Sequence, residues 1–322
     1  MLMPILLFLL GFLLLIKGGD WFVDGATAIA HRFNLPELLI GATVVSIGTT
    51  LPEVMVSSQA ALLGNSGISY GNAIGSIICN TSLIAAITIT AKPGPVNRNT
   101  LRLPVFAFFI AAAVYSFIAY TTGRFERWQG IMFLCMFVVY MIISVMQMKN
   151  VDPNEGADEE QEAPESSIGK EIGLLVIGAI AIAIGARLLV DNGTLIAQAL
   201  GVPDSVIGLT MVALGTSLPE LITAITSLMK GHGALSLGNV IGANLFNIVL
   251  VSGAAITIAP FSIPADKMLF GMNSSLVVDI PVMLGVMGIM CIPTLLKGRL
   301  SRWQGILLLC IYACFTIYQF VI

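Results

Sequence analysis

The sequence predicts an all-α membrane protein with ten transmembrane helices, arranged as two five-helix repeats of inverted topology. Two observations predict this fold class. First, the chain of 322 residues is 57% hydrophobic and only 10% charged, with a mean hydropathy of +0.95. A soluble domain of this length cannot bury so much apolar surface. Second, an internal repeat covers nearly the whole chain.

Ten apolar segments are long enough to cross a bilayer, which takes about 20 residues per helix. In chain order they are residues 3–30, 38–63, 68–91, 101–121, 127–148, 169–198, 205–229, 234–258, 275–296 and 303–321. The first and sixth are longer than a span requires, so we expect them to be tilted. The first also lacks the basic leader of a cleaved signal peptide, which predicts a retained helix.

The positions of Lys and Arg predict the orientation in the membrane. With the N-terminus outside, ten basic residues fall on the cytoplasmic side and three on the outer side, which places both termini outside. The chain then divides into a first repeat, residues 1–149, an acidic cytoplasmic linker, 150–168, and a second repeat, 169–322. Seven acids in the linker account for much of the net charge of -3, so the charge does not indicate nucleic-acid binding.

The two repeats align closely. A shift of 167 residues superimposes Asp24 on Asp191, Glu53 on Glu220, Gly71 on Gly238 and Asn80 on Asn247. Between positions 36 and 80, 17 of 45 paired residues are identical, and later GRFERWQG (123–130) matches GRLSRWQG (298–305) with a shift of 175. Each copy holds an odd number of spans, so the second copy must enter the membrane from the opposite side. Such inverted repeats are typical of secondary transporters with a site at the midplane.

Each copy carries an acid inside a span, within VVSIGTTLPE and MVALGTSLPE. A carboxylate near the bilayer centre costs about 2.5 to 3.5 kcal/mol on insertion scales, so Glu53 and Glu220 require a partner. A cation shared by both is the simplest one. Gly48 loosens the first helix, and Pro52 frees a backbone carbonyl one turn earlier.

Further oxygen donors lie around the two acids. Helical spacing places them on one face of each acid-bearing span and on the span that follows it. The candidate metal ligands are Ser46, Thr49, Thr50, Glu53, Ser76, Asn80, Ala213 through its carbonyl, Thr216, Ser217, Glu220 and Asn247. Neither GT motif contains Cys or His, so the donors indicate a hard cation. Two carboxylates balance one Ca²⁺ or two Na⁺, which suits exchange of a divalent ion for several monovalent ions.

GTTLPE with GNAIGSIICN, and GTSLPE with GNVIGANLFN, resemble the two alpha repeats of the sodium/calcium exchangers, most closely their small prokaryotic members. The resemblance covers essentially all ten spans. It implies a secondary active antiporter of the inner (plasma) membrane that exchanges Na⁺ for Ca²⁺ by alternating access. It also implies no enzymatic activity, no cofactor and no obligatory protein partner beyond the lipid bilayer.

The resemblance also implies roles for individual residues. Glu53 and Glu220 would hold Ca²⁺, with Thr49 and Thr216 as further ligands. One Na⁺ position would use Glu53, the Ala213 carbonyl, Thr216, Ser217 and Ser76; the other would use Glu220, the Ser46 carbonyl, Thr49 and Thr50. Asn80 and Asn247 would flank the centre.

The chain departs from the family pattern at several positions. Ala243 replaces a serine that relatives often carry, so one Na⁺ position loses a hydroxyl that Ser76 provides on the other. Asn80 and Asn247 are both amides, where relatives carry Asp at one central position. Two buried carboxylates would also suit a Ca²⁺/H⁺ or K⁺-coupled antiporter of the same fold, and a passive cation channel is the alternative from a different class.

The remaining charged residues and the glycines are expected to be structural. Lys17, Asp20 and Arg187 are expected to be packing or ion-pair partners, and His31 and His232 to be solvated at the inner loop edges. The paired glycines of the GNAIG and GNVIG stretches are expected to let helix backbones approach closely.

Overall fold

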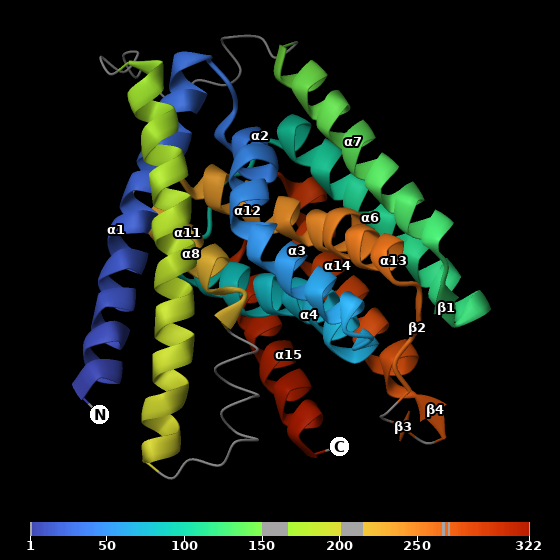
Figure 1. The fold of residues 1–322 in the computed structure, drawn as a ribbon. Helices are drawn as coiled ribbons and strands as arrows, with labels where there is room; N and C mark the ends of the chain where they lie inside the picture. The colour runs from blue at the N-terminus through green and yellow to red at the C-terminus, as the bar shows by residue number, and fades with distance from the viewer. Residues whose placement is uncertain (1, 150–166, 201–214, 266–267, 270, 322) are drawn as a thin grey trace.

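The structure is a computed structural model that describes residues 2–149, 167–200, 215–265, 268–269 and 271–321. This part of the chain is almost entirely helical, as the composition predicts (Figure 1). Within it, eight helical segments are long and apolar enough to cross a membrane. They are Leu2–Arg32, Glu37–Leu62, Ser66–Ala91, Arg98–Thr122, Arg127–Met148, Ile168–Ala199, Gly233–Ile258 and Ser275–Lys297.

The other two predicted spans are also helical where they are described. Helix α11 (Leu218–Met229) forms the end of the predicted span 205–229, whose first part lies outside the described residues. Helix α15 (Arg302–Val321) covers the predicted span 303–321. Hydropathy therefore located the helices of the described chain to within a few residues.

Several spans consist of consecutive short helices. The helices are α1 (Leu2–Arg32), α2 (Glu37–Ile40), η1 (Gly41–Val45), α3 (Ser46–Leu62), α4 (Ser66–Cys79), η2 (Asn80–Ala85), α5 (Ala86–Ala91), α6 (Arg98–Thr122), α7 (Arg127–Lys149), α8 (Ile168–Ala199), α11, α12 (Gly233–Phe246), η4 (Asn247–Ser252), α13 (Gly253–Ile258), η5 (Ser275–Asp279), α14 (Ile280–Lys297) and α15. The η segments are π-helical turns, which are rare and often lie at functional sites. Segments η2 and η4 begin at Asn80 and Asn247, which are equivalent positions of the repeat.

Helices α1 and α8 lie side by side along one flank, opposite α6 and α7 (Figure 1). Glycines set their separation. A Cβ atom at Gly11 would lie 2.8 Å from the carbonyl oxygen of Gly185, and one at Gly18 would lie 3.0 Å from that of Gly178. Gly11 aligns with Gly178 and Gly18 with Gly185, so these are two copies of one contact.

The last helix of each copy packs on the other copy. A Cβ atom at Gly130 of α7 would lie 2.6 Å from the backbone nitrogen of Thr257 in α13. One at Gly305 of α15 would lie 2.8 Å from the backbone nitrogen of Thr90 in α5. Gly130 and Gly305 align in the repeat, as do Thr90 and Thr257. The two copies are therefore interlocked by equivalent contacts.

Short strands link the copies in the same way. The strands are β1 (Arg124–Phe125), β2 (Phe261–Ser262), β3 (Met268–Leu269) and β4 (Met272–Asn273). Strand β1 pairs with β2 in antiparallel fashion, with Arg124 opposite Ser262, and an isolated bridge joins Pro95 to Arg299. Arg124 aligns with Arg299 and Pro95 with Ser262, so one pairing again occurs twice. Strands β3 and β4 form a separate hairpin.

The predicted ion pairs of the long helices are confirmed. Lys17 lies 3.9 Å from Asp20, and Arg187 lies 3.6 Å from Asp191. Lys230, which follows α11, reaches Asp24 of α1 at 2.6 Å. These pairs are partly to largely exposed, so each contributes at most about 1 kcal/mol.

The two histidines lie in a charged cluster, so the prediction of solvated side chains is wrong. Glu37 Oε1 lies 2.7 Å from His232 Nδ1 and 3.3 Å from His31 Nε2. The turn between α11 and α12 approaches the end of α1 and the start of α2, which half-buries both rings. No local sequence pattern reveals this contact, because the residues are distant in the chain.

Candidate cation site

The two GT motifs fold differently although their sequences match. In the first copy α3 continues through Gly48 and Pro52, and the proline removes the helical partner of the Gly48 carbonyl. In the second copy the helix begins inside the motif: Ser217 is the N-cap of α11 and Pro219 lies in its first turn. The predicted helix interruption is thus present in the second motif, whereas the first helix is uninterrupted.

The glycine of each GT motif, Gly48 or Gly215, allows a side chain of a long helix to pack against the motif. A Cβ atom at Gly48 would lie 3.1 Å from the ring of Phe22 in α1, and one at Gly215 would lie 2.6 Å from Val190 in α8. Each long helix therefore lies directly against the acid-bearing motif of its own copy.

Glu53 and Glu220 are fully buried, with 0% of their surface exposed. Within the described chain, none of their four carboxylate oxygens has a hydrogen-bond partner. The same is true of Thr50 Oγ1, Ser217 Oγ and Asn247 Oδ1, and of both polar atoms of the Asn80 amide. Because buried polar groups are almost always paired, this cluster of unsatisfied oxygens fits a site that binds a cation.

Contacts between the copies bring these residues together. Helix α3, which carries Glu53, contacts η4, which begins at Asn247; helix α11, which carries Glu220, contacts η2, which begins at Asn80. Helices α3 and α11 also contact each other. Each acid therefore lies beside residues of the other copy.

The remaining predicted ligands have the following surroundings. Thr49 Oγ1 lies 3.2 Å from Asn239 Oδ1, and the Ser46 hydroxyl donates to the Gly41 carbonyl at 2.7 Å. Ser76 is buried and Thr216 is half-buried. Ala213 lies outside the described residues. Ala243, the position without a hydroxyl, is fully buried, and its carbonyl accepts a hydrogen bond from Asn247.

Two buried asparagines, one half-buried asparagine and a buried threonine near the site were missed by the sequence reasoning. Asn72 donates to the Glu53 carbonyl at 3.1 Å, Asn239 contacts Thr49, and Asn244 donates to Thr81 at 2.7 Å. Asn72 and Asn239 belong to the repeated GNAIG and GNVIG stretches, and this repetition could have identified them as candidate site residues. Asn244 has no polar counterpart, since Ile77 occupies its position in the first copy.

The donor set fits a hard cation. Across the described segments, no group of three His, Cys, Asp or Glu side chains is arranged to hold a metal. The site instead has two carboxylates and several neutral hydroxyl, amide and carbonyl oxygens. This composition suits Ca²⁺ and Na⁺ better than zinc or another transition metal.

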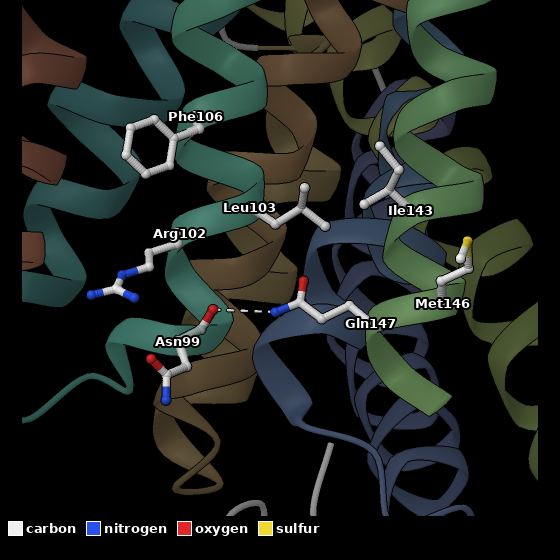
Figure 2. A pocket seen from close by; sticks show the side chains of 7 residues that line it. All are labelled: Asn99, Arg102, Leu103, Phe106, Ile143, Met146 and Gln147. Carbon is white, nitrogen blue, oxygen red and sulfur yellow. Dashed lines mark hydrogen bonds between the residues drawn. The ribbon is translucent and has the colours of Figure 1, made fainter. Parts of the chain in front are cut away.

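A cavity of about 550 Å³ lies elsewhere, between α6 and α7. Figure 2 shows its walls: Phe106 and Leu103 from α6, Ile143 and Met146 from α7, and Arg102 extending away from α7. Gln147 closes one end by donating to the Asn99 carbonyl at 3.2 Å. None of the candidate ligands lines this cavity.

The predicted close packing holds for the glycines of the second copy only: a Cβ atom at Gly71 or Gly75 of the first copy would have nothing from the rest of the described chain within 4 Å, so the prediction is wrong there. A Cβ atom at Gly238 would lie 2.1 Å from the Leu38 carbonyl oxygen, and one at Gly242 would lie 2.6 Å from Ala42. Helix α12 thus lies against α2 and η1 of the first copy. This contact places Asn239, between the two glycines, beside Thr49.

Comparison with known proteins places the chain in a family. The family described as sodium/calcium exchanger protein matches residues 3–146 and 170–321. The chain belongs to the sodium/calcium exchanger family. The curated "Sodium/calcium exchanger MaX1" of Methanosarcina acetivorans is 32% identical and aligns over 98% of both chains. The "Inner membrane protein YrbG" of Escherichia coli is 34% identical over 81% of both chains.

Solved structures of the sodium-calcium exchanger NCX_Mj have the same fold. The one soaked with 10 mM Na⁺ and zero Ca²⁺ gives a TM-score of 0.81 at 33% identity and covers 97% of both chains. The one soaked with 2.5 mM Na⁺ and 0.1 mM Ca²⁺ gives a TM-score of 0.79 with the same identity and coverage. The chain is therefore a member of the sodium/calcium exchanger family, with the length and the fold of its prokaryotic members.

Proposed function

We propose that this exchanger is a secondary active antiporter that moves Ca²⁺ in one direction and Na⁺ in the other. The observation that carries the proposal is the pair of fully buried, unpaired carboxylates, one from each copy of the repeat. Two such charges are costly in a membrane unless cations neutralise them. One Ca²⁺ or two Na⁺ neutralise them equally, so the ions compete for the same charge.

The proposed ligand sets are those that the resemblance to the family implies. Glu53 and Glu220 hold Ca²⁺ together with Thr49 and Thr216. One Na⁺ lies at Glu53, Ser76, Ser217, Thr216 and the Ala213 carbonyl; another lies at Glu220, Thr49, Thr50 and the Ser46 carbonyl. Asn80 and Asn247 flank the centre. The unpartnered Thr50 and Ser217 hydroxyls in the described chain, at equivalent positions of the repeat, support this assignment.

Two repeats of inverted topology, with ten spans and both termini outside, fit the observed contacts. Segments assigned to one side of the membrane contact each other: Pro95 bridges Arg299 on the proposed inner side, and Arg124 pairs with Ser262 on the outer side. Residues 1–149 and 169–322 then form the two repeats, joined by a cytoplasmic linker at 150–168. The protein would reside in the plasma membrane.

Alternating access then follows from helix packing. Helices α1 and α8 touch each other along paired glycines and lie against the GT motifs. Sliding of this pair relative to the remaining helices would open the site to one side at a time.

A flux assay with purified protein in liposomes tests the function. An outward Na⁺ gradient at clamped pH should drive uptake of ⁴⁵Ca²⁺, and replacing Na⁺ with K⁺ or choline should stop it. Uptake driven by a pH gradient alone would instead establish Ca²⁺/H⁺ exchange. Currents through single open pores would establish a channel and overturn the antiporter.

A further inference from the structure

Asn239 lies fully buried in α12, between the two glycines that hold this helix against the first copy. Its side-chain oxygen accepts a hydrogen bond from the Thr49 hydroxyl at 3.2 Å and lies 3.4 Å from the Ser46 hydroxyl. The Ser46 hydroxyl is also 3.0 Å from the Asn239 carbonyl. The second copy therefore contacts two proposed ligands of the first copy through one residue.

Thr49 differs from other buried threonines in these helices. Thr43, Thr81 and Thr223 donate their hydroxyl protons to the carbonyl four residues earlier, at 2.7 to 2.8 Å. This back-bonding is the usual choice of threonine in a helix. It occupies both the hydroxyl proton and a carbonyl oxygen that a cation would otherwise use.

For Thr49 the nearby carbonyl is that of Ser46, at 3.5 Å, which is longer than the contact to Asn239. The Thr49 proton is therefore directed to Asn239. As a result, the lone pairs of Thr49 Oγ1 and the carbonyl oxygen of Ser46 both stay available. These are two of the oxygens assigned to the ion next to Glu220.

We propose that Asn239 is a positioning residue for the transported cation, which accepts the Thr49 hydroxyl proton so that Thr49 Oγ1 and the Ser46 carbonyl oxygen face the ion. Asn239 acts through Thr49 and does not itself bind the ion. The proposal rests on the proposed function, because it assumes that Thr49 and Ser46 are cation ligands. It adds a residue outside the set that the GT motifs and the central amides supply.

Equilibrium binding of ⁴⁵Ca²⁺ to purified protein tests this role, with Na⁺-driven flux measured in parallel. Asn239→Leu keeps the branched shape and the number of side-chain heavy atoms but removes the acceptor, and should weaken Ca²⁺ binding about two- to tenfold, as expected for one lost hydrogen bond. Asn239→Asp keeps an acceptor oxygen and has no amide donor, so it should restore binding relative to Asn239→Leu. Failure of Asn239→Asp to do so would show that the acceptor is not the group that matters.

A double-mutant cycle separates positioning from general packing. Thr49→Ala should weaken binding by itself, and adding Asn239→Leu should then have little further effect, because the hydroxyl that Asn239 orients is already absent. Asn72→Leu is the matched control: Asn72 is the equivalent residue but contacts the Glu53 carbonyl and Ser57, so its effect should multiply with that of Thr49→Ala. Multiplying effects for Asn239 and Thr49 would overturn the proposal.

The two readouts keep this proposal distinct from the proposed function. Wild-type protein that binds Ca²⁺ but shows no Na⁺-driven flux would overturn the antiporter, while the Asn239–Thr49 coupling would still be read from binding. Wild-type protein that binds no Ca²⁺ would overturn both.

Discussion

Asn72 and Asn239 occupy the same position of the repeat, yet they make different contacts. Asn72 stays within its own copy, where its amide nitrogen donates to the Glu53 carbonyl at 3.1 Å and to Ser57 at 2.8 Å. Asn239 crosses to the other copy and accepts from Thr49. A site made of two equivalent halves must be asymmetric whenever it opens to only one side, and these asparagines are one place where the hydrogen bonding of the halves differs.

The turns that precede α4 and α12 show a second difference. Both contain a glycine with positive φ, Gly64 at 73° and Gly231 at 92°, which a side chain would strain. The residues beside these glycines are Leu63 and Asn65 in the first copy, but Lys230 and His232 in the second. Only the second pair carries groups for ion pairing, which tie its turn to α1 and α2. The two turns therefore have the same backbone conformation but differ in the charged side chains that they carry.

The largest effect on Ca²⁺ uptake is expected at Glu53 and Glu220, the equivalent acids that, within the described residues, have the same buried, unpaired environment in both copies. Glu53→Gln and Glu220→Gln should each reduce ⁴⁵Ca²⁺ uptake by roughly a hundredfold or more, because either change removes half of the negative charge that balances a bound Ca²⁺. Glu126→Gln is a control, since this acid is exposed and paired with Arg124. Near-normal uptake in either of the first two variants would show that the two acids do not share an ion.

An intermediate effect is expected where the copies differ by one hydroxyl. Ser76→Ala should raise the Na⁺ concentration for half-maximal exchange, and Ala243→Ser should lower it, each by about two- to tenfold, the range for one neutral oxygen ligand. The variants are measured at fixed Ca²⁺ in liposomes, singly and together. An unchanged Na⁺ dependence for Ala243→Ser would mean that this position does not face Na⁺.

The smallest effect is expected at the turns. Lys230→Leu gives the second turn the residue of the first and removes the 2.6 Å contact to Asp24. Because the pair is partly exposed, stability should fall by about 1 kcal/mol or less. Exchange should become faster with unchanged Ca²⁺ affinity, since α1 is held less tightly. Thermal unfolding and initial flux rates check both points, and a slower rate would contradict the assigned role of the turn.

Hydropathy and the internal repeat were sufficient to predict the helices of the described chain, because bilayer thickness fixes helix length. They could not predict that α3 runs through its GT motif while α11 starts inside the matching one, since nearly identical sequences give both outcomes. Tertiary contacts decide between the two. The π-helical turns at Asn80 and Asn247 carry no local signal either.

The candidate site likewise has residues that the sequence predicts and contacts that it does not. The two acids were evident from their position inside apolar spans, where a buried charge is costly and therefore indicates a functional site. The contact between Thr49 and Asn239 joins residues 190 positions apart, so no local spacing indicates it. Asn244 with Thr81 is a further case: the equivalent positions, Ile77 and Ile248, are both buried and apolar, so the sequence repeat conceals that polar pair.

The interlocking of α15 with α5 has a consequence for biosynthesis. Helix α5 belongs to the first copy, but the residue that fits against its Thr90 is Gly305, near the end of the chain. The first half of the protein therefore leaves the ribosome before the helix that packs on this face of α5 has been made. The contact between α5 and α15 has to wait for the synthesis of α15, and contacts of such long sequence separation are slow to form.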